Sequence, residues 1–243
     1  HKKGDLTVYK VDKDNNKIAL GGVTFDLFSE EFGKIIGTYT TDENGEIHVK
    51  DLRTGNYKWI EKETNKWYNL GEDTATEVVW DKDTANVIEN ELKKGQIRVI
   101  KVDKDNKELK LEGVEFEVLD GNGNVLEKII TDENGEALTQ RYPIRDFDKL
   151  TLREVKTQEE YVLNEEQTIE LTENEITNIT FENERIKGFV EITKVDSKDK
   201  DKKLEGAEFG LYNENDELID TLITDKNGKA TSVELYKGKY YLK

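Results

Sequence analysis

The sequence has no cysteine and no methionine, one proline and only two histidines, His1 and His48, among its 243 residues. Without cysteine the chain can form no disulfide, no thiolate nucleophile and no cysteine-based zinc site. With two histidines, a Ser-His-Asp triad or a histidine-rich metal site is a poor explanation of the chain. We therefore expect no metal and no cofactor.

Long apolar runs and excess positive charge are also missing. No apolar run approaches the roughly 20 residues that span a bilayer, and no signal peptide opens the chain. The formal net charge of -17 opposes binding to nucleic acid or to an anionic membrane surface. We expect no nucleic-acid partner and no membrane contact in this segment, which is either cytosolic or excised from a larger protein.

Alternating runs of Thr, Val, Ile and Tyr are plentiful and no long helical period is visible, which predicts an all-β protein. One strand-like stretch occurs three times: Gly4–Asp12, Gln96–Asp103 and Val190–Asp196. In each copy the apolar face continues into a lysine: Lys10, Lys101 and Lys194. Burying an ammonium group is costly, so the recurrence in one register predicts a chemical role for the lysine.

Internal repetition extends beyond this strand. The lysines are 91 and 93 residues apart, and each is followed by Gly-x-x-Phe and by Thr-Asp-x-Asn-Gly, where Asn-Gly predicts a tight hairpin. We predict repeats at 1–92 and 93–187 and an incomplete repeat at 188–243. The short links Glu91–Gly95 and Glu184–Gly188 favour domains stacked end to end.

Acid-rich loops follow each lysine strand and superficially resemble calcium loops: Asp12–Asn16, Asp103–Asn106 and Asp196–Asp201. A calcium loop of this type needs glycine at its sixth position and glutamate at its twelfth, and these are not both present. We interpret the loops as solvated connections.

Four further polar residues continue apolar strand faces inward. Glu61 shares a face with Tyr57 and Trp59, and Glu154 occupies the corresponding place 93 residues later. Asn90 and Asn183 lie near the ends of the first two repeats, again 93 residues apart. Glu63 also has inward parity, so only the position relative to the aromatic residues favours Glu61 as the acid.

A buried lysine, glutamate and asparagine are arranged for acyl transfer. Burial lowers a lysine pKa toward the neutral amine and raises a glutamate pKa toward the acid. The amine can then attack the carboxamide while the glutamate shuttles protons and ammonia leaves. The product is a Lys-Asn isopeptide bond. The structural alternative is a lysine that snorkels or an inward charge that protects a sheet edge, but it does not explain two complete triads in matched register.

These motifs together resemble tandem Cna B-type domains of Gram-positive surface adhesins and pilins. The resemblance implies prealbumin-like (inverse Ig-like) β-sandwiches in which a first-strand lysine and a last-strand asparagine join spontaneously with help from a glutamate. It assigns Lys10, Glu61 and Asn90 to the first repeat and Lys101, Glu154 and Asn183 to the second. The family's Ala-Pro-x-Gly-Tyr stretch is replaced here by Glu63–Tyr68, which leaves the shape of that loop open. Lys194 has neither glutamate nor asparagine to react with.

The resulting prediction is a structural stalk segment of a secreted, cell-wall-anchored bacterial surface protein. We expect a monomer. We also expect that the protein is not an enzyme, because each cross-link forms once and there is no turnover. We expect any host extracellular-matrix or cell-surface partner to bind through other domains of the parent protein.

The alternative is a ligand-binding adhesin module or a pilin subunit on the same fold. Trp59 is expected in the core, whereas Trp67 and Trp80 either pack at an edge, which we favour, or form a recognition patch. A hydrolase using Glu61 or Glu154 is disfavoured, because an active site is seldom copied into every repeat of a stalk.

Overall fold

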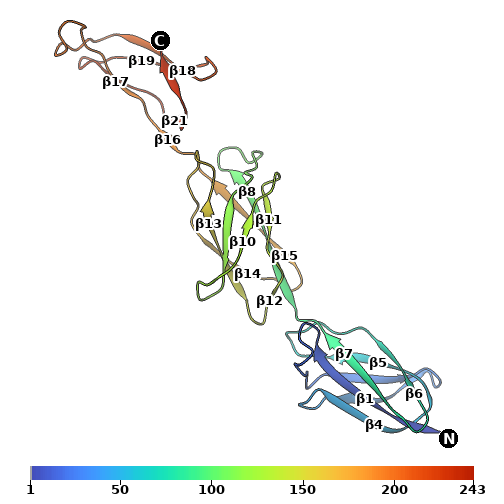
Figure 1. The fold of residues 1–243 in the computed structure, drawn as a ribbon. Helices are drawn as coiled ribbons and strands as arrows, with labels where there is room; N and C mark the ends of the chain where they lie inside the picture. The colour runs from blue at the N-terminus through green and yellow to red at the C-terminus, as the bar shows by residue number, and fades with distance from the viewer. Residues whose placement is uncertain (1) are drawn as a thin grey trace. The chain divides into compact units, whose positions relative to one another are not determined.

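The computed structural model describes residues 2–243, which contain strands and no helix (Figure 1). The all-β prediction is therefore confirmed, and the described range contains no helix that could cross a membrane. By their internal contacts the described residues fall into two compact units. One comprises the residues up to Ile97 with Gln140–Leu150 and Ile169–Thr177, and the other comprises the remainder.

Two sheets are formed within the first repeat. Their strand orders are β4-β1-β7 and β3-β2-β5-β6, and β1 runs antiparallel to β4 but parallel to β7. The strands are β1 (Lys3–Asp12), β2 (Thr24–Ser29), β3 (Lys34–Thr40), β4 (Glu46–Arg53), β5 (Gly55–Glu63), β6 (Thr74–Val78) and β7 (Asp83–Asn90).

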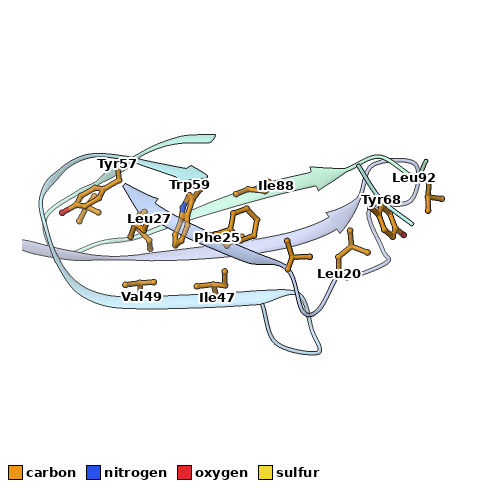
Figure 2. Close-up of a cluster of buried hydrophobic side chains, with 14 residues drawn as sticks. Leu20, Phe25, Leu27, Ile47, Val49, Tyr57, Trp59, Tyr68, Ile88 and Leu92 are labelled. Carbon is orange, nitrogen blue, oxygen red and sulfur yellow. The ribbon is translucent and has the colours of Figure 1, made fainter. Parts of the chain in front are cut away.

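Apolar side chains from both sheets meet in one core (Figure 2). Alternation places Leu6 and Val8 of β1 on the inner face, where both are fully buried. Phe25 of β2 meets Trp59 of β5 edge to face, with ring centroids 6.0 Å apart. This packing makes the first repeat a β-sandwich and confirms Trp59 as a core residue.

The second repeat has the same plan. Strands β11 and β12 flank β8, which also pairs with β15, and the other sheet has the order β10-β9-β13-β14. The strands are β8 (Lys94–Asp103), β9 (Glu115–Leu119), β10 (Val125–Ile130), β11 (Glu136–Leu138), β12 (Tyr142–Pro143), β13 (Lys149–Lys156), β14 (Gln167–Glu170) and β15 (Ile176–Asn183).

The third repeat forms smaller sheets of order β16-β21, β17-β20 and β19-β18-β22. Its lysine strand is shorter than the predicted Val190–Asp196, because only three residues of that stretch pair as a strand. The strands are β16 (Lys187–Gly188), β17 (Glu191–Thr193), β18 (Glu208–Asn213), β19 (Leu218–Ile223), β20 (Lys229–Thr231), β21 (Leu235–Tyr236) and β22 (Tyr240–Leu242).

At each Thr-Asp-x-Asn-Gly motif the predicted tight turn forms, but the predicted pairing of the flanking strands does not. In the first repeat the Gly45 N–H donates to Asp42 O and the Asp42 N–H donates to Glu46 O, both at 3.0 Å. The turn at Asn44-Gly45 joins β3 to β4, but these strands pair with different neighbours and belong to different sheets. Gly45 has φ +74°, whereas Asn44 keeps a negative φ. The turn is held by Asp42, whose Oδ1 accepts the backbone N–H groups of Asn44 and Glu46. The Thr-Asp-x-Asn-Gly motif therefore marks a crossing between the two layers of the sandwich, whereas Asn122-Gly123 joins β9 to β10, which pair within one sheet.

Candidate functional site

The lysine of each lysine strand is held at its backbone by the glycine of the Asn-Gly turn. The Lys10 N–H donates to Gly45 O at 2.8 Å, and the Lys101 N–H donates to Gly135 O at 2.7 Å. A Cβ atom on either glycine would lie 2.5 Å from the carbonyl oxygen of its lysine. Both glycines also have positive φ, so the close approach and the backbone conformation both require glycine.

Lys10 is fully buried and points into the core of the first sandwich. Its Nζ donates to Glu61 Oε2 at 2.9 Å and to Asn90 Oδ1 at 2.6 Å. Asn90 Nδ2 in turn donates to Glu61 Oε1 at 2.5 Å. The amine, the carboxyl group and the carboxamide thus form a closed hydrogen-bonded ring, which brings together the three residues predicted for this repeat.

The second sandwich holds the same ring. Lys101, fully buried, donates from Nζ to Asn183 Oδ1, and its Nζ lies 3.2 Å from Glu154 Oε2. Asn183 Nδ2 donates to Glu154 Oε1 at 2.6 Å. The three residues predicted for the second repeat therefore also lie within hydrogen-bonding distance of one another.

Burial lowers the pKa of both lysines. Removal from water lowers the pKa of Lys10 despite its contact with Glu61. The same cause lowers the pKa of Lys101 to about 8, although Glu154 opposes the shift. The apolar surroundings include aromatic rings, since Lys10 Nζ lies 5.5 Å from the ring centroid of Phe25. In each site the neutral, nucleophilic amine therefore costs less free energy to form than on a free lysine.

Glu61 and Glu63 do not share an environment. Glu63 is exposed, so its predicted inward orientation is wrong. The reason is a register shift: Glu61 pairs with Phe25 and Glu63 with Thr24, so the alternation of faces is interrupted between them. A corresponding shift follows Glu154. Only Glu61 of the two acids reaches the lysine and the asparagine.

The sequence reasoning missed a threonine in each site. Asn90 Nδ2 donates to Thr64 Oγ1, and Asn183 Nδ2 donates to Thr157 Oγ1, both at 2.9 Å. Each threonine lies three residues after the glutamate of its repeat, and the two are 93 residues apart. That spacing was the available signal. With the glutamate, the threonine occupies both N–H groups of the carboxamide and fixes its orientation.

The aspartate that ends the lysine strand in each of the first two repeats also has a role that the sequence reasoning missed. Asp12 is buried, and its Oδ1 accepts the backbone N–H groups of Asp14 and Asn15. Its Oδ2 accepts the hydroxyl of Tyr68 at 2.7 Å. Burial and this hydrogen bond raise the pKa of Tyr68 to about 12, so the phenol stays neutral and donates. Asp103 and Tyr161 repeat the contact at 2.8 Å.

Lys194 differs from the other two strand lysines. It is half-buried, with its Nζ 5.6 Å from the ring centroid of Phe209. Within residues 2–243, no carboxylate lies at ion-pair distance from it. The same range contains no group of three or more His, Asp or Glu side chains placed to hold a metal ion.

The tryptophans of the first repeat divide between core and surface. Trp67 packs against the core, as expected. Trp80 is 59% exposed, with Lys2 Nζ 4.9 Å from its ring centroid. The expectation that Trp80 packs at an edge is therefore wrong. It lies two residues beyond the end of the short strand β6, whose last paired residue is Val78.

Comparison with known proteins bears on the fold. The sequence matches the SpaA prealbumin-like fold domain at residues 4–93, 95–185 and 188–243. This match confirms the predicted prealbumin-like fold in tandem copies. No curated protein sequence matches the chain.

Several solved structures are similar to the chain. The Bacillus anthracis TIE protein is 30% identical over the whole chain with a TM-score of 0.80, and the chain spans 45% of that protein. A streptococcal ancillary pilin is 22% identical over 76% of this chain and 63% of its own, with a TM-score of 0.34. The minor pilin of Streptococcus agalactiae is 18% identical over 75% of this chain and 96% of its own, with a TM-score of 0.34.

Proposed function

Because the chain belongs to the family of SpaA prealbumin-like fold domains, we propose that it is a structural stalk segment of a Gram-positive surface protein. Its first two repeats are rigidified by intramolecular isopeptide bonds, Lys10 to Asn90 and Lys101 to Asn183. The observation that carries the proposal is the lysine–glutamate–asparagine ring, buried in the core and present twice.

The geometry supports a reaction in which Glu61 and Glu154 move the protons. In the first repeat, a proton passes from Lys10 Nζ to Glu61 Oε2, and the neutral amine attacks Cγ of Asn90. The carboxyl group then protonates Nδ2, which it already contacts through Oε1 at 2.5 Å. The Cγ–Nδ2 bond breaks and ammonia leaves. Lys10 Nζ gives up two protons in all: the first reaches the leaving nitrogen through Glu61, and the second passes to Glu61 Oε2 as the amide forms, so ammonia leaves and Glu61 ends protonated.

Proximity is the main contribution of the fold. An amide does not exchange with a free amine at a useful rate in water, but the two groups are held here in contact and away from solvent. Well-oriented groups of this kind reach effective concentrations of about 10⁵ M or more. Each bond forms once within its own chain, so the protein is not an enzyme that turns over substrate.

From the family and the proposed stalk role we infer that the protein lies outside the cell, anchored to the wall. A host extracellular-matrix or cell-surface partner would bind through other domains of a longer parent, and the segment itself is a monomer. The alternative, a ligand-binding adhesin module or a pilin subunit, would draw on Trp80, an exposed aromatic residue beside Lys2. A single exposed side chain supports it less well than the duplicated buried ring supports the stalk.

Intact mass spectrometry of the denatured chain tests the proposal. Each bond releases one ammonia, so the measured mass should fall below the sequence mass by two ammonias. Tryptic digestion should yield two branched peptides, one joining Lys10 to Asn90 and one joining Lys101 to Asn183. An unmodified mass contradicts the proposal.

A further inference from the structure

The two sites differ at one position beside the reacting carboxamide. In the second repeat this position is Asn164, ten residues after Glu154. Asn164 Nδ2 donates to Asn183 Oδ1 and also to Glu182 O at 2.9 Å. Its backbone N–H lies 3.3 Å from Glu154 Oε2. Asn164 therefore contacts the carboxamide oxygen as well as the acid of the second site.

In the first repeat the same position is Gly71, ten residues after Glu61 and 93 residues before Asn164. A Cβ atom on Gly71 would lie 2.8 Å from both Asn90 Oδ1 and Glu61 Oε2, and 3.5 Å from Glu89 O. These atoms correspond to the three that Asn164 contacts. The positions are therefore equivalent, and the first repeat has no side chain there to donate a hydrogen bond.

The carboxamide oxygen is the atom on which charge develops. When Lys101 Nζ bonds to Cγ of Asn183, the C=O π pair moves to Oδ1, which becomes an oxyanion until the Cγ–Nδ2 bond breaks and ammonia leaves. The attacking amine uses its lone pair for the new bond and must turn away from its hydrogen bond to Oδ1. The N–H group of Asn164 needs no such change, because it approaches Oδ1 from a separate residue.

We propose that Asn164 is a catalytic residue of the second repeat, which stabilises the oxyanion on Asn183 Oδ1 and which the first repeat lacks. The inference rests on the proposed isopeptide chemistry and assigns it a donor beyond the lysine–glutamate–asparagine ring. Preorganised donors aimed at a developing oxyanion lower the barrier more than donors that must reorient. The second bond should therefore depend on a side chain that the first bond does without.

The test requires a full-length chain whose second repeat has not yet reacted. Segments 1–136 and 137–243 can be ligated in denaturant through a cysteine at position 137, which desulfurisation converts back to the native Ala137. The chain has no other cysteine, so the native sequence is restored. Dilution from denaturant starts folding, and acid-quenched samples give the loss of ammonia and the Lys101–Asn183 branched peptide against time.

Asn164→Gly copies the residue of the first repeat and should slow bond formation in the second repeat by about tenfold to a hundredfold. This is less than the loss of a donor from a fully buried oxyanion hole, because Asn164 is half-buried. Asn164→Asp keeps the size but removes the donor and should be slow as well. Asn122→Gly, in an exposed turn of the same repeat, is the matched control and should react at the unaltered rate.

Folding is measured separately in the Lys101→Ala background, where no bond can form. Asn164→Gly should refold there, by circular dichroism, at nearly the rate of its parent. If refolding slows as much as bond formation did, or if either Asn164 variant bonds at the unaltered rate, the inference is overturned. If the unaltered chain loses no ammonia from its second repeat, the proposed function itself fails. The reciprocal Gly71→Asn is a poor test, because its Cβ would crowd Asn90 and Glu61.

Discussion

Lys10 and Asn90 lie on adjacent parallel strands, two residues out of register. The backbone of Lys10 is opposite Ile88, and that of Asn90 is opposite Asp12. The lysine side chain is long enough to cover this offset, and its Nζ reaches Asn90 Oδ1 at 2.6 Å. A bond between them would join the first strand of the repeat to its last, near the carboxyl ends of both.

The role of Glu61 can be separated from that of its neighbour Glu63. Glu61→Gln keeps the size of the side chain but removes the group that transfers protons, so the first repeat should stay unlinked while the second still reacts. Intact mass should show a deficit of one ammonia instead of two. Loss of a cross-link that closes a loop of about 80 residues should lower the free energy of unfolding by roughly 4 kcal/mol.

The matched control for this variant is Glu63→Gln, which changes an exposed acid two residues away. It should keep both bonds and unfold like the unaltered chain. A full deficit of two ammonias in Glu61→Gln, or the loss of one bond in Glu63→Gln, would show that the acid is wrongly assigned.

The pH dependence of bond formation distinguishes two roles for Glu154. The reactive form is a neutral Lys101 beside a protonated Glu154. It has the same total number of protons as the ion pair, because one proton has only moved from the lysine to the glutamate. With the pKa of Lys101 at about 8, the pair loses this proton as the pH rises through 8. The amine is then still neutral, but no acid remains to protonate the leaving nitrogen.

Bond formation in the second repeat should therefore be nearly constant just below pH 8 and fall by about tenfold per unit above it. The rate is measured on the chain ligated at Ala137 and refolded at a series of pH values, with folding followed in Lys101→Ala. A rate that instead rises through pH 8 would mean that deprotonation of the lysine alone limits the reaction and that Glu154 is not the acid.

Strand alternation and the repeat spacing together predicted the buried ring. Side chains of period two place Lys10, Glu61 and Asn90 on inner faces, and the 93-residue spacing places Glu154 and Asn183 on equivalent faces. Alternation failed at Glu63, because a local register shift there cannot be read from a single strand. It also gave no account of Asn44-Gly45, since the choice of partner strand depends on which sheet covers the core.

Contacts made by loops were beyond prediction for a different reason. Thr64 and Asn164 lie outside regular strands and reach the asparagine only after the loop has folded back over the sandwich. Alternation says nothing about such segments. Repeat spacing would have paired Thr64 with Thr157, but it would have discarded Asn164, because its counterpart Gly71 is a different residue. The exposure of Trp80 was not predicted either, because it depends on where the strand β6 ends, and strand ends cannot be read from alternation.

The proposed bond also determines how the first repeat carries force. Load that enters β1 at its amino end passes along the strand to Lys10, and it would leave through the side-chain amide to Asn90, the last residue of β7. The residues between them would lie outside the load path, and no hydrogen-bond ladder would have to shear. In single-molecule pulling from the two ends of the chain, we expect the first two repeats not to extend.

Lys10→Ala removes the first bond and should let the first repeat unravel. The released segment is about 80 residues long, which corresponds to roughly 260 Å of additional contour length at about 3.3 Å per residue. Glu61→Gln, which keeps both partners but leaves them unlinked, should release the same length. Lys17→Ala, which changes an exposed lysine in the following loop, should release none. If the unaltered first repeat extends by this length at forces typical of ordinary β-sandwiches, the segment does not act as a covalently locked stalk, and the binding-module alternative gains support.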